Sequence, residues 1–297
     1  MTTTPDDQLN QNPEFDLCVL IPAYNEQSRI GTTLLDIIQT LNNWNCSAEI
    51  LIADDGSTDD TVKVCQAIFA EHRLHSNDRV LSLSKNMGKG AAVAHGLKNS
   101  RARWTIMMDA DNSAHLSELP KLASHITDSG PHLSKSHHMI IGSRRMNTSQ
   151  VHANITRVCV GLIYSFTLRI LGLRLANDTQ CGFKLYSHHA ARLIADHAQE
   201  HGFSFDIEHL LIAKHAGLIV PEVGILWDHV DGSKVNPVLD GLKMLSKIIT
   251  MRRPVRQRVL PTRLPDPDAL DLAHVDSDHA SQIEIKINPQ PALVKSI

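Results

Sequence analysis

The chain has 297 residues, of which 42% are hydrophobic and 21% are charged, so it can bury the core of one large domain. The formal net charge of −3 argues against a basic nucleic-acid-binding protein, and we expect no nucleic-acid partner. The cysteines are few, scattered and odd in number, which excludes a disulfide framework or a closely spaced zinc site and predicts reduced thiols, as in the cytoplasm: Cys18, Cys46, Cys65, Cys159 and Cys181.

No segment has the pattern of a secretory leader or a membrane span. Residues 1–16 are polar and acidic, without the basic and apolar regions of a signal peptide. The longest uncharged apolar run lies between Arg157 and Arg169, well short of the ~18 to 20 residues that cross a bilayer. We therefore expect no membrane-spanning helix.

Short apolar runs alternate with helical patterns through the first half of the chain. Five runs have the composition of buried strands: residues 16–22, 48–53, 79–83, 104–108 and 138–141. Helical patterns fill the gaps: residues 26–41, from 58 onward, 88–98 and 116–126. This alternation predicts an α/β fold, with a doubly wound, mostly parallel sheet flanked by helices and a ligand crevice at the carboxyl ends of its strands.

The pattern changes after Arg145. Residues 155–173 are apolar almost all round, although Arg157 and Arg169 interrupt them. A compact segment, two helices, a strand and a helix are expected next, at residues 178–186, 190–201, 206–216, 218–227 and 238–251. We predict one domain at 15–255, with disordered tails at 1–14 and 256–297, because the ends are polar and the second is rich in proline.

Acidic side chains follow three of the predicted strands at the point where each strand ends. The segments concerned are 22–26 (PAYNE), 54–59 (DDGSTD) and 109–111 (DAD). Carboxylates that gather at one edge of a sheet are costly unless a positive charge lies among them. The Asp-x-Asp spacing suits Mg²⁺ or Mn²⁺ held jointly by the protein and a diphosphate, so we predict a divalent-cation site.

Motifs of other nucleotide-binding proteins are missing. The first strand-to-helix turn lacks Gly-x-Gly-x-x-Gly, and no Gly-Lys-Ser/Thr phosphate loop occurs. Residues 86–90 (NMGKG) either contact a phosphate or form a helix start in which glycines permit an unusual backbone. A dinucleotide dehydrogenase and a P-loop enzyme are therefore disfavoured.

The order of these motifs resembles glycosyltransferase family 2, which has the GT-A fold: Pro-x-Tyr-Asn-Glu, Asp-Asp-Gly-Ser-x-Asp, Asn-x-Gly-Lys-Gly and Asp-Ala-Asp. Later motifs resemble the polyprenyl-phosphate sugar synthases, and most closely the dolichyl-phosphate β-glucosyltransferase group: residues 142–144 (GSR), 178–184 (DTQCGFK), 205–208 (FDIE) and 231–234 (DGSK). The resemblance spans about residues 17–253, so it leaves out the C-terminal tail.

The resemblance implies roles for individual residues. The metal, Mg²⁺ or Mn²⁺, would be held by Asp109 and Asp111, and the acceptor would be bound by Arg144, Arg157 and Glu208. The nucleotide-sugar donor would be bound by Pro22, Tyr24, Glu26, Asp54, Asp55, Lys89, Asp109 and Ser233. Catalysis would rest on Asp111, Asp178, Arg144 and Lys234, with Asp178 in an orienting role. Three of these residues also have a structural alternative: Asp178 could cap a turn, Glu208 could be a solvated helix residue, and Lys234 could be a surface lysine.

The implied reaction is the metal-dependent, inverting transfer of glucose from UDP-glucose to a polyprenyl phosphate of the dolichyl or undecaprenyl type. Ser113 stands where mannosyl members usually have glutamine, which disfavours mannose. The alternatives are a GDP-mannose-dependent mannosyltransferase, a family 2 transferase with a soluble hydroxyl acceptor, and, outside this class, a sugar nucleotidyltransferase or a sugar-nucleotide sensor.

A polyprenyl acceptor lies in a bilayer, so the enzyme must reach a membrane surface. We predict helices for the interface and the acceptor after the fifth strand, at about residues 150–175, where basic side chains can reach headgroups; a buried core helix is the alternative. Residues 234–258 carry seven basic side chains and one acidic side chain, which favours anionic lipid or a solvated helix end. We expect a peripheral protein on the cytoplasmic face of a membrane, and the sequence does not indicate its oligomeric state.

Overall fold

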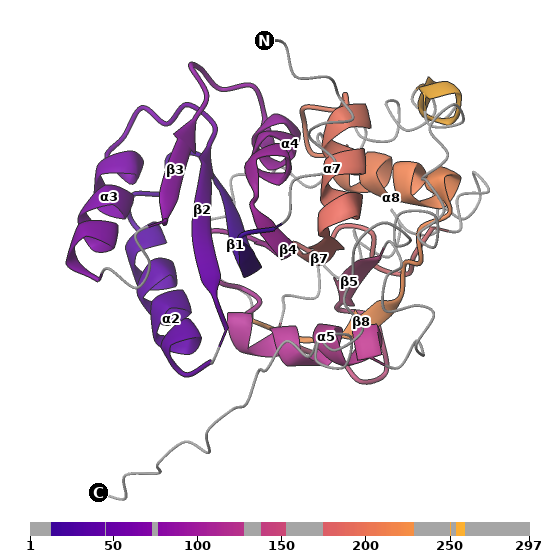
Figure 1. Cartoon of the computed structure of the whole chain (residues 1–297), viewed down its shortest axis with the longest axis horizontal. Helices are drawn as coiled ribbons and strands as arrows, with labels where there is room; N and C mark the ends of the chain where they lie inside the picture. The colour runs from indigo at the N-terminus through magenta and orange to yellow at the C-terminus, as the bar shows by residue number, and fades with distance from the viewer. Residues whose placement is uncertain are drawn as a thin grey trace, which may run out of the picture.

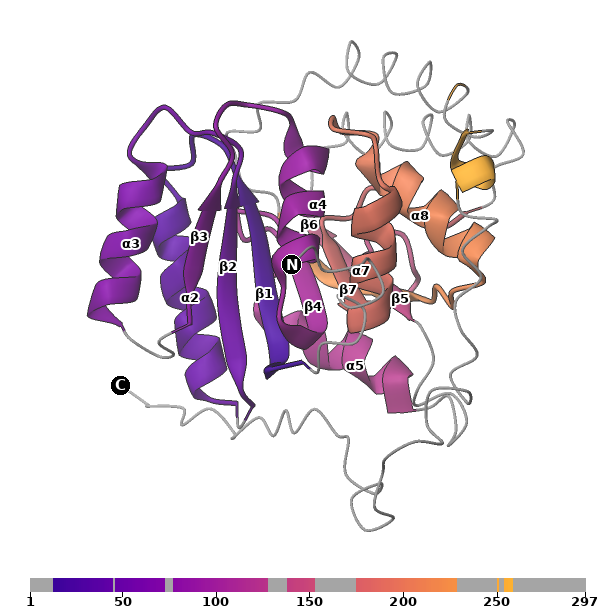
Figure 2. The ribbon, with the colours of Figure 1, turned by 45° about the horizontal axis from the view of Figure 1, so that its top comes forward.

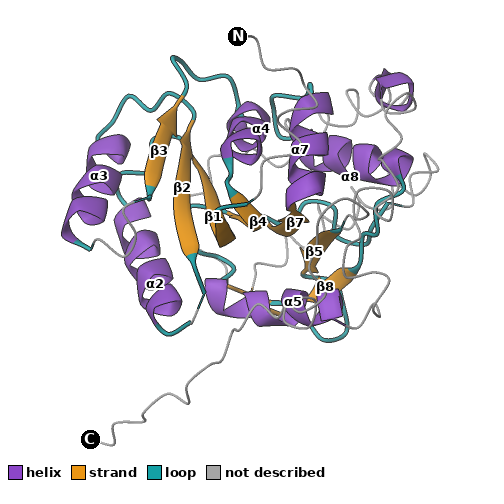
Figure 3. Ribbon diagram, in the orientation of Figure 1, coloured by secondary structure: helices purple, strands orange, loops and turns teal. Residues whose placement is uncertain are grey.

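The structure, a computed structural model, describes residues 13–44, 46–72, 77–127, 138–152, 175–228, 250 and 254–258. It confirms the predicted α/β class, because helices cover both faces of a mostly parallel central sheet (Figures 1 and 2). The secondary-structure view shows the same layers, with the strands between two groups of helices (Figure 3).

The sheet has seven described strands in the order β3-β2-β1-β4-β7-β5-β8. Their bounds are β1 Phe15–Ala23, β2 Ala48–Asp54, β3 Arg79–Ser82, β4 Ala102–Met108, β5 Met139–Ser143, β7 Phe183–Ser187 and β8 Glu222–Gly224. Strand β7 runs antiparallel to both neighbours, and the other described pairs of this sheet are parallel. Two further strands, β6 (Gln150–His152) and β9 (Leu226–Asp228), form a separate parallel pair.

Alternating side chains of the strands build two hydrophobic cores. On β1, Leu17, Val19 and Ile21 face one core, whereas Cys18 and Leu20 face the other, as the two-residue period of a strand requires. The first core is covered by α2 (Ile30–Asn42), α3 (Thr61–Glu71), the 3₁₀ turn η1 (Leu116–Glu118) and α5 (Leu119–Thr127). The second is covered by α4 (Lys89–Asn99), α7 (His188–His197) and α8 (Phe205–Ala216).

The strand predictions failed in two places. Strand β7 overlaps residues 178–186, where the sequence predicted a compact segment and no strand, and it inserts antiparallel between β4 and β5. The single strand expected at 218–227 is divided between β8 and β9, which belong to different sheets. Both outcomes depend on pairing between distant strands, which local periodicity does not encode.

Several predicted elements fall outside the described residues. The helix expected at 155–173 and most of that expected at 238–251 are among them, as are residues 1–12 and 259–297. Residues 254–258, at the boundary expected near 255, form a helical turn in which Val255 is buried in the second core. No described helix is long and apolar enough to span a membrane.

Candidate active site

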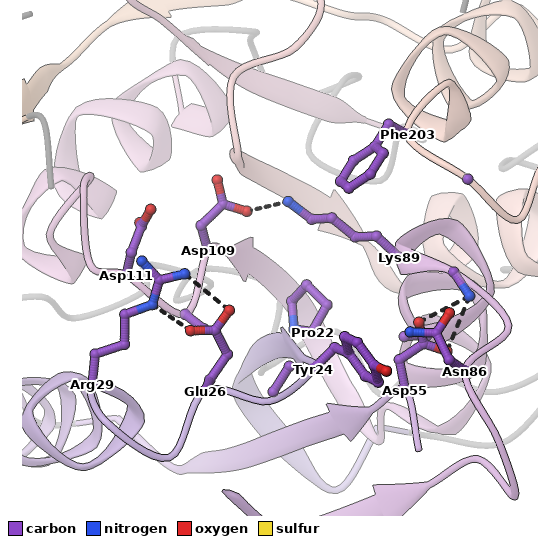
Figure 4. A pocket seen from close by; sticks show the side chains of 15 residues that line it. Pro22, Tyr24, Glu26, Arg29, Asp55, Asn86, Lys89, Asp109, Asp111 and Phe203 are labelled. Atoms are coloured by element: carbon purple, nitrogen blue, oxygen red, sulfur yellow. Dashed lines mark hydrogen bonds and ion pairs between the residues drawn. The ribbon is translucent and has the colours of Figure 1, made fainter. Parts of the chain in front are cut away.

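A cavity of about 440 Å³ opens where β1, β2 and β4 end, as expected for the ligand crevice of this fold class. Seven predicted residues line it: Pro22, Tyr24, Glu26, Asp55, Lys89, Asp109 and Asp111. They converge from three strand ends and from the start of α4 (Figure 4). The structure thus brings together most of the predicted donor residues and both predicted metal ligands.

The loop that carries Asp109 and Asp111 is held from α2. The Thr33 hydroxyl donates to the Ala110 carbonyl oxygen at 2.8 Å, between the two aspartates. The next residue, Asn112, has a φ of 57°, and its amide donates to Asp36 at 2.9 Å. Asparagine tolerates this left-handed conformation better than most residues, so the turn can direct both carboxylates into the cavity.

Two cations pair with carboxylates of the cavity lining, one with Asp109 and one with Glu26. Lys89 Nζ is 2.5 Å from Asp109 Oδ1, while Arg29 pairs with Glu26 through its Nε and, at 2.9 Å, through a terminal nitrogen. Burial lowers the pKa of Lys89, but Asp109 and Asp206 outweigh this effect, so the pKa lies above its usual value. Both cations are therefore charged at neutral pH, and they balance the acidic cavity.

Gly182 packs directly against Asp109. A Cβ atom at position 182 would lie 1.9 Å from Asp109 Oδ2, which is far inside any allowed contact. The glycine of the 178–184 motif thus allows the backbone to approach the carboxylate, and it fixes one side of the predicted metal site.

We expect Gly182→Ala to move the Asp109 carboxylate and to lower transfer at least tenfold, because small displacements of catalytic groups are costly. Gly31→Ala on α2 is the matched control, since its Cβ would meet only side chains at 3.4 Å. The measurement is turnover with labelled nucleotide sugar beside thermal unfolding. Full activity of Gly182→Ala would contradict the assignment.

The two neighbouring aspartates after β2 have different surroundings. Asp55 lines the cavity and accepts hydrogen bonds from Met87 N at 2.7 Å and Gly88 N at 2.8 Å. Burial raises the pKa of Asp55, and these bonds offset only part of the rise. Asp54 is not among the lining residues; it is buried and accepts from Ser57 N at 3.1 Å. Its side chain therefore shapes the turn that presents Asp55.

Arg144 and Asp178 form a partly buried ion pair outside the lining of this cavity. Asp178 accepts from Arg144 Nε at 2.7 Å, from a terminal nitrogen at 2.9 Å and from the backbone N–H at 2.9 Å. Burial would raise the pKa of Asp178, but Arg144 outweighs burial and lowers it to about 2. An ionised carboxylate with these donors is suited to orienting Arg144 rather than to accepting a proton.

Glu208 is also absent from the lining of the cavity. It is 1% exposed, and its carboxylate is bound by Arg258 and by the backbone N–H groups of residues 199 and 200. The solvated alternative is therefore wrong, while contact with an acceptor stays a prediction. Three other predicted residues, Arg157, Ser233 and Lys234, lie outside the described residues.

Sequence reasoning gave no role to the lining residues Arg29 and Phe203, whereas Asn86 lies in the 86–90 motif that it associated with a phosphate. Arg29 follows Glu26 by three residues, a spacing at which helix-start side chains meet, so its signal was present. It also missed a buried ion pair between Lys184 and Asp206, beneath Lys89. Both residues stand in motifs that the resemblance singled out, but no local pattern pairs them.

The carboxylate side chains at the cavity are suitable ligands for a hard divalent cation. Within the described residues, no three His, Cys, Asp or Glu side chains converge as a complete metal site. Asp109 and Asp111 supply oxygen ligands at the cavity, and Mg²⁺ or Mn²⁺ commonly completes its shell with water and phosphate oxygens. The two carboxylates at the cavity can therefore supply the protein's share of such a site.

Residues 18–193 match the family model of Glycosyl transferase family 2. The chain belongs to this family. As a family 2 member it is an enzyme, a glycosyltransferase, and the resemblance predicted from its motifs is confirmed. The match includes the cavity-lining motifs after β1, β2 and β4, and it ends before residues 202, 203 and 208.

Several relatives that match about 80% of this chain carry the same name. This family 2 enzyme is 35% identical over 249 residues to a protein of Saccharomyces cerevisiae named dolichyl-phosphate beta-glucosyltransferase, covering 80% of this chain and 75% of the relative. A Dictyostelium discoideum protein of the same name is 34% identical over 257 residues, covering 82% and 76%. The human protein of that name is 29% identical, covering 81% and 76%.

Solved structures agree on the fold of this family 2 enzyme. Glucosyl-3-phosphoglycerate synthase from Mycobacterium tuberculosis, in complex with Mn²⁺, UDP-glucose and glycerol 3-phosphate, superposes with a TM-score of 0.56 at 17% identity. The alignment covers 86% of each chain. At this identity the likeness establishes the GT-A-like fold alone.

Proposed function

We propose that this family 2 glycosyltransferase transfers glucose from UDP-glucose to dolichyl phosphate or another polyprenyl phosphate, with inversion at the anomeric carbon. The observation that carries the proposal is the shared name of relatives that are 29–35% identical over about 80% of this chain. The acidic cavity at the strand ends supports it, because a nucleotide diphosphate needs both hydrogen-bonding groups and charge compensation.

The donor would occupy the 440 Å³ cavity. Asp109 and Asp111 would hold Mg²⁺ or Mn²⁺, which supplies positive charge to the departing diphosphate. Lys89 already lies beside Asp109, so its ammonium group can add to that charge. Pro22, Tyr24, Glu26 and Asp55 would bind the nucleoside, with Asp54 acting through the turn that presents Asp55.

The acceptor supplies its own nucleophile. A phosphate monoester is anionic near neutral pH, since its second ionisation falls at about 6, so no general base is required. Its oxygen attacks the anomeric carbon, the bond from that carbon to the diphosphate oxygen breaks, and UDP leaves with the electron pair. A single in-line displacement converts an α-linked donor into a β-linked product.

Arg144 would bind the acceptor phosphate, because a guanidinium matches phosphate geometry, and Asp178 would hold it in place. Glu208 does not line the cavity, so it would affect the acceptor only indirectly, through the loop whose backbone it binds at residues 199 and 200. Arg157, Ser233 and Lys234 keep their predicted roles at the acceptor and the diphosphate. Since a polyprenyl chain lies in a bilayer, we propose that the enzyme works as a peripheral protein on the cytoplasmic face of a membrane.

The test is a matrix of donors and acceptors with the purified chain. UDP-glucose, GDP-mannose and UDP-N-acetylglucosamine are each offered to a short-chain polyprenyl phosphate in vesicles and to soluble 3-phosphoglycerate, with Mg²⁺, Mn²⁺ or a chelator. We expect labelled glycolipid only from UDP-glucose with polyprenyl phosphate and metal. A preference for GDP-mannose or for the soluble acceptor would replace this proposal.

A further inference from the structure

The loop at residues 198–204, between α7 and α8, forms part of the cavity wall. It supplies Gly202 and Phe203 to the lining, and Phe203 is 43% exposed. Figure 4 shows Phe203 beside Lys89, on the other side of the cavity from Tyr24. A large apolar side chain that is exposed at a binding cavity is available to contact the ligand.

One side of this 198–204 loop packs on the start of α4. The His201 carbonyl oxygen accepts hydrogen bonds from Gly90 N at 2.7 Å and from Ala91 N at 3.3 Å. A Cβ atom at Gly88 would lie 2.3 Å from the His201 oxygen, and one at Gly90 would lie 2.2 Å from the Glu200 oxygen. The glycines that flank Lys89 therefore have a structural reason, which is close backbone contact with this loop.

The other side of the loop is held by Glu208. One carboxylate oxygen of Glu208 accepts from Gln199 N at 2.8 Å and from Glu200 N at 2.7 Å. The other accepts from a terminal nitrogen of Arg258 at 2.8 Å. Arg258 also donates to the His197 carbonyl oxygen at 2.6 Å, so it joins the end of α7 to α8.

Burial makes this arrangement sensitive to the loss of Arg258. The Glu208 side chain is 2% exposed and that of Arg258 is 19% exposed. A buried carboxylate that loses its cation keeps an uncompensated charge, which is far more costly than losing a surface ion pair. Movement of the Glu208 carboxylate would then break the two hydrogen bonds that hold the backbone at residues 199 and 200.

We propose that Glu208 and Arg258 are positioning residues for the donor site, acting through the 198–204 loop on Phe203 and on the backbone around Lys89. The helical turn at 254–258, which lies beyond the family match at 18–193, would thereby take part in nucleotide binding. The inference rests on the proposed function only for the identity of the nucleotide.

The test compares Arg258→Gln with Arg256→Gln, a control that removes an exposed arginine from the same helical turn. We expect Arg258→Gln to weaken UDP binding, measured by calorimetry with Mn²⁺, roughly tenfold, and to speed amide hydrogen exchange at residues 199–200. Arg258→Lys should have smaller effects than Arg258→Gln, because lysine keeps the charge beside Glu208 but lacks the several nitrogens with which Arg258 bonds Glu208 and two carbonyl oxygens.

A double-mutant cycle separates positioning from a general loss of stability. If Arg258 acts through the loop, Phe203→Ala and Arg258→Gln weaken UDP binding by less together than the sum of their separate effects. Additive effects, or unchanged amide exchange with a lower melting temperature, would overturn the proposal. If the proposed donor is wrong and GDP binds instead, the same cycle with GDP tests the loop independently.

Discussion

Asp111→Asn is expected to lower sugar transfer by about three orders of magnitude or more while leaving the fold unchanged. Asp111 lines the cavity, and its Oδ1 accepts a hydrogen bond from Ser113 N at 3.0 Å. An asparagine side chain has the same shape and can still accept that bond, so the turn should survive. What the variant loses is the negative charge that a divalent cation requires.

Asp109→Asn should have a similarly large effect with one difference. Its carboxylate is paired with Lys89 in the structure, so the variant also leaves Lys89 without this partner. We therefore expect a greater change in the UDP affinity measured without metal than for Asp111→Asn. Turnover, Mn²⁺ binding followed by electron paramagnetic resonance, and thermal unfolding report the three properties separately.

The control for both variants is Asp60→Asn. Asp60 belongs to the acidic run after β2, but it pairs with Lys63 on the surface and its side chain is 61% exposed. Surface pairs of this kind contribute little to stability, so activity and folding should be unchanged. Undiminished turnover of both cavity variants in the presence of chelator would remove the basis of the metal site.

The strand ends were predictable because they depend on local pattern. Five short apolar runs gave β1 to β5 with small errors at their ends, and parallel strands with helical crossovers place their carboxyl ends at one edge. Asp109 and Asp111 therefore line the cavity, as the sequence predicted. Neighbouring side chains at a strand end point in opposite directions, so only one of the adjacent pair Asp54 and Asp55 can face the cavity. The local pattern does not indicate which one.

Contacts between distant residues were not predictable. Glu208 meets a side chain 50 positions away, and Arg144 meets Asp178 34 positions away. The glycines at 88 and 90 were explained by helix-start conformation or by a phosphate, whereas backbone atoms of residues 200 and 201 fill the space beside them. Each pairing requires the assembled sheet, with β7 between β4 and β5, before the partners lie close together.

Asp178→Asn is the second substitution for which we expect a large effect, on stability and on the acceptor. Asparagine would place an amide against a guanidinium whose Nε and a terminal nitrogen now bind the carboxylate at 2.7 and 2.9 Å. Because the Arg144 side chain is 28% exposed, we expect a loss of about 2 kcal/mol in the free energy of unfolding, below the range for fully buried pairs. The KM for polyprenyl phosphate should rise, with that for UDP-glucose nearly constant.

The pH dependence of this stability difference has a defined sign. The folded pKa of Asp178, about 2, lies below the usual aspartate value of 3.8, so ionised Asp178 stabilises the fold above about pH 4. That contribution, about 2 kcal/mol from the shift, is lost as the pH falls from about 4 through 2. Urea unfolding of the two proteins should thus differ most at neutral pH and converge in acid. Asp196→Asn, which removes an exposed partner of Lys98 at 3.2 Å, should show no such convergence, and a pH-independent difference for Asp178→Asn would mean that the ion pair does not account for it.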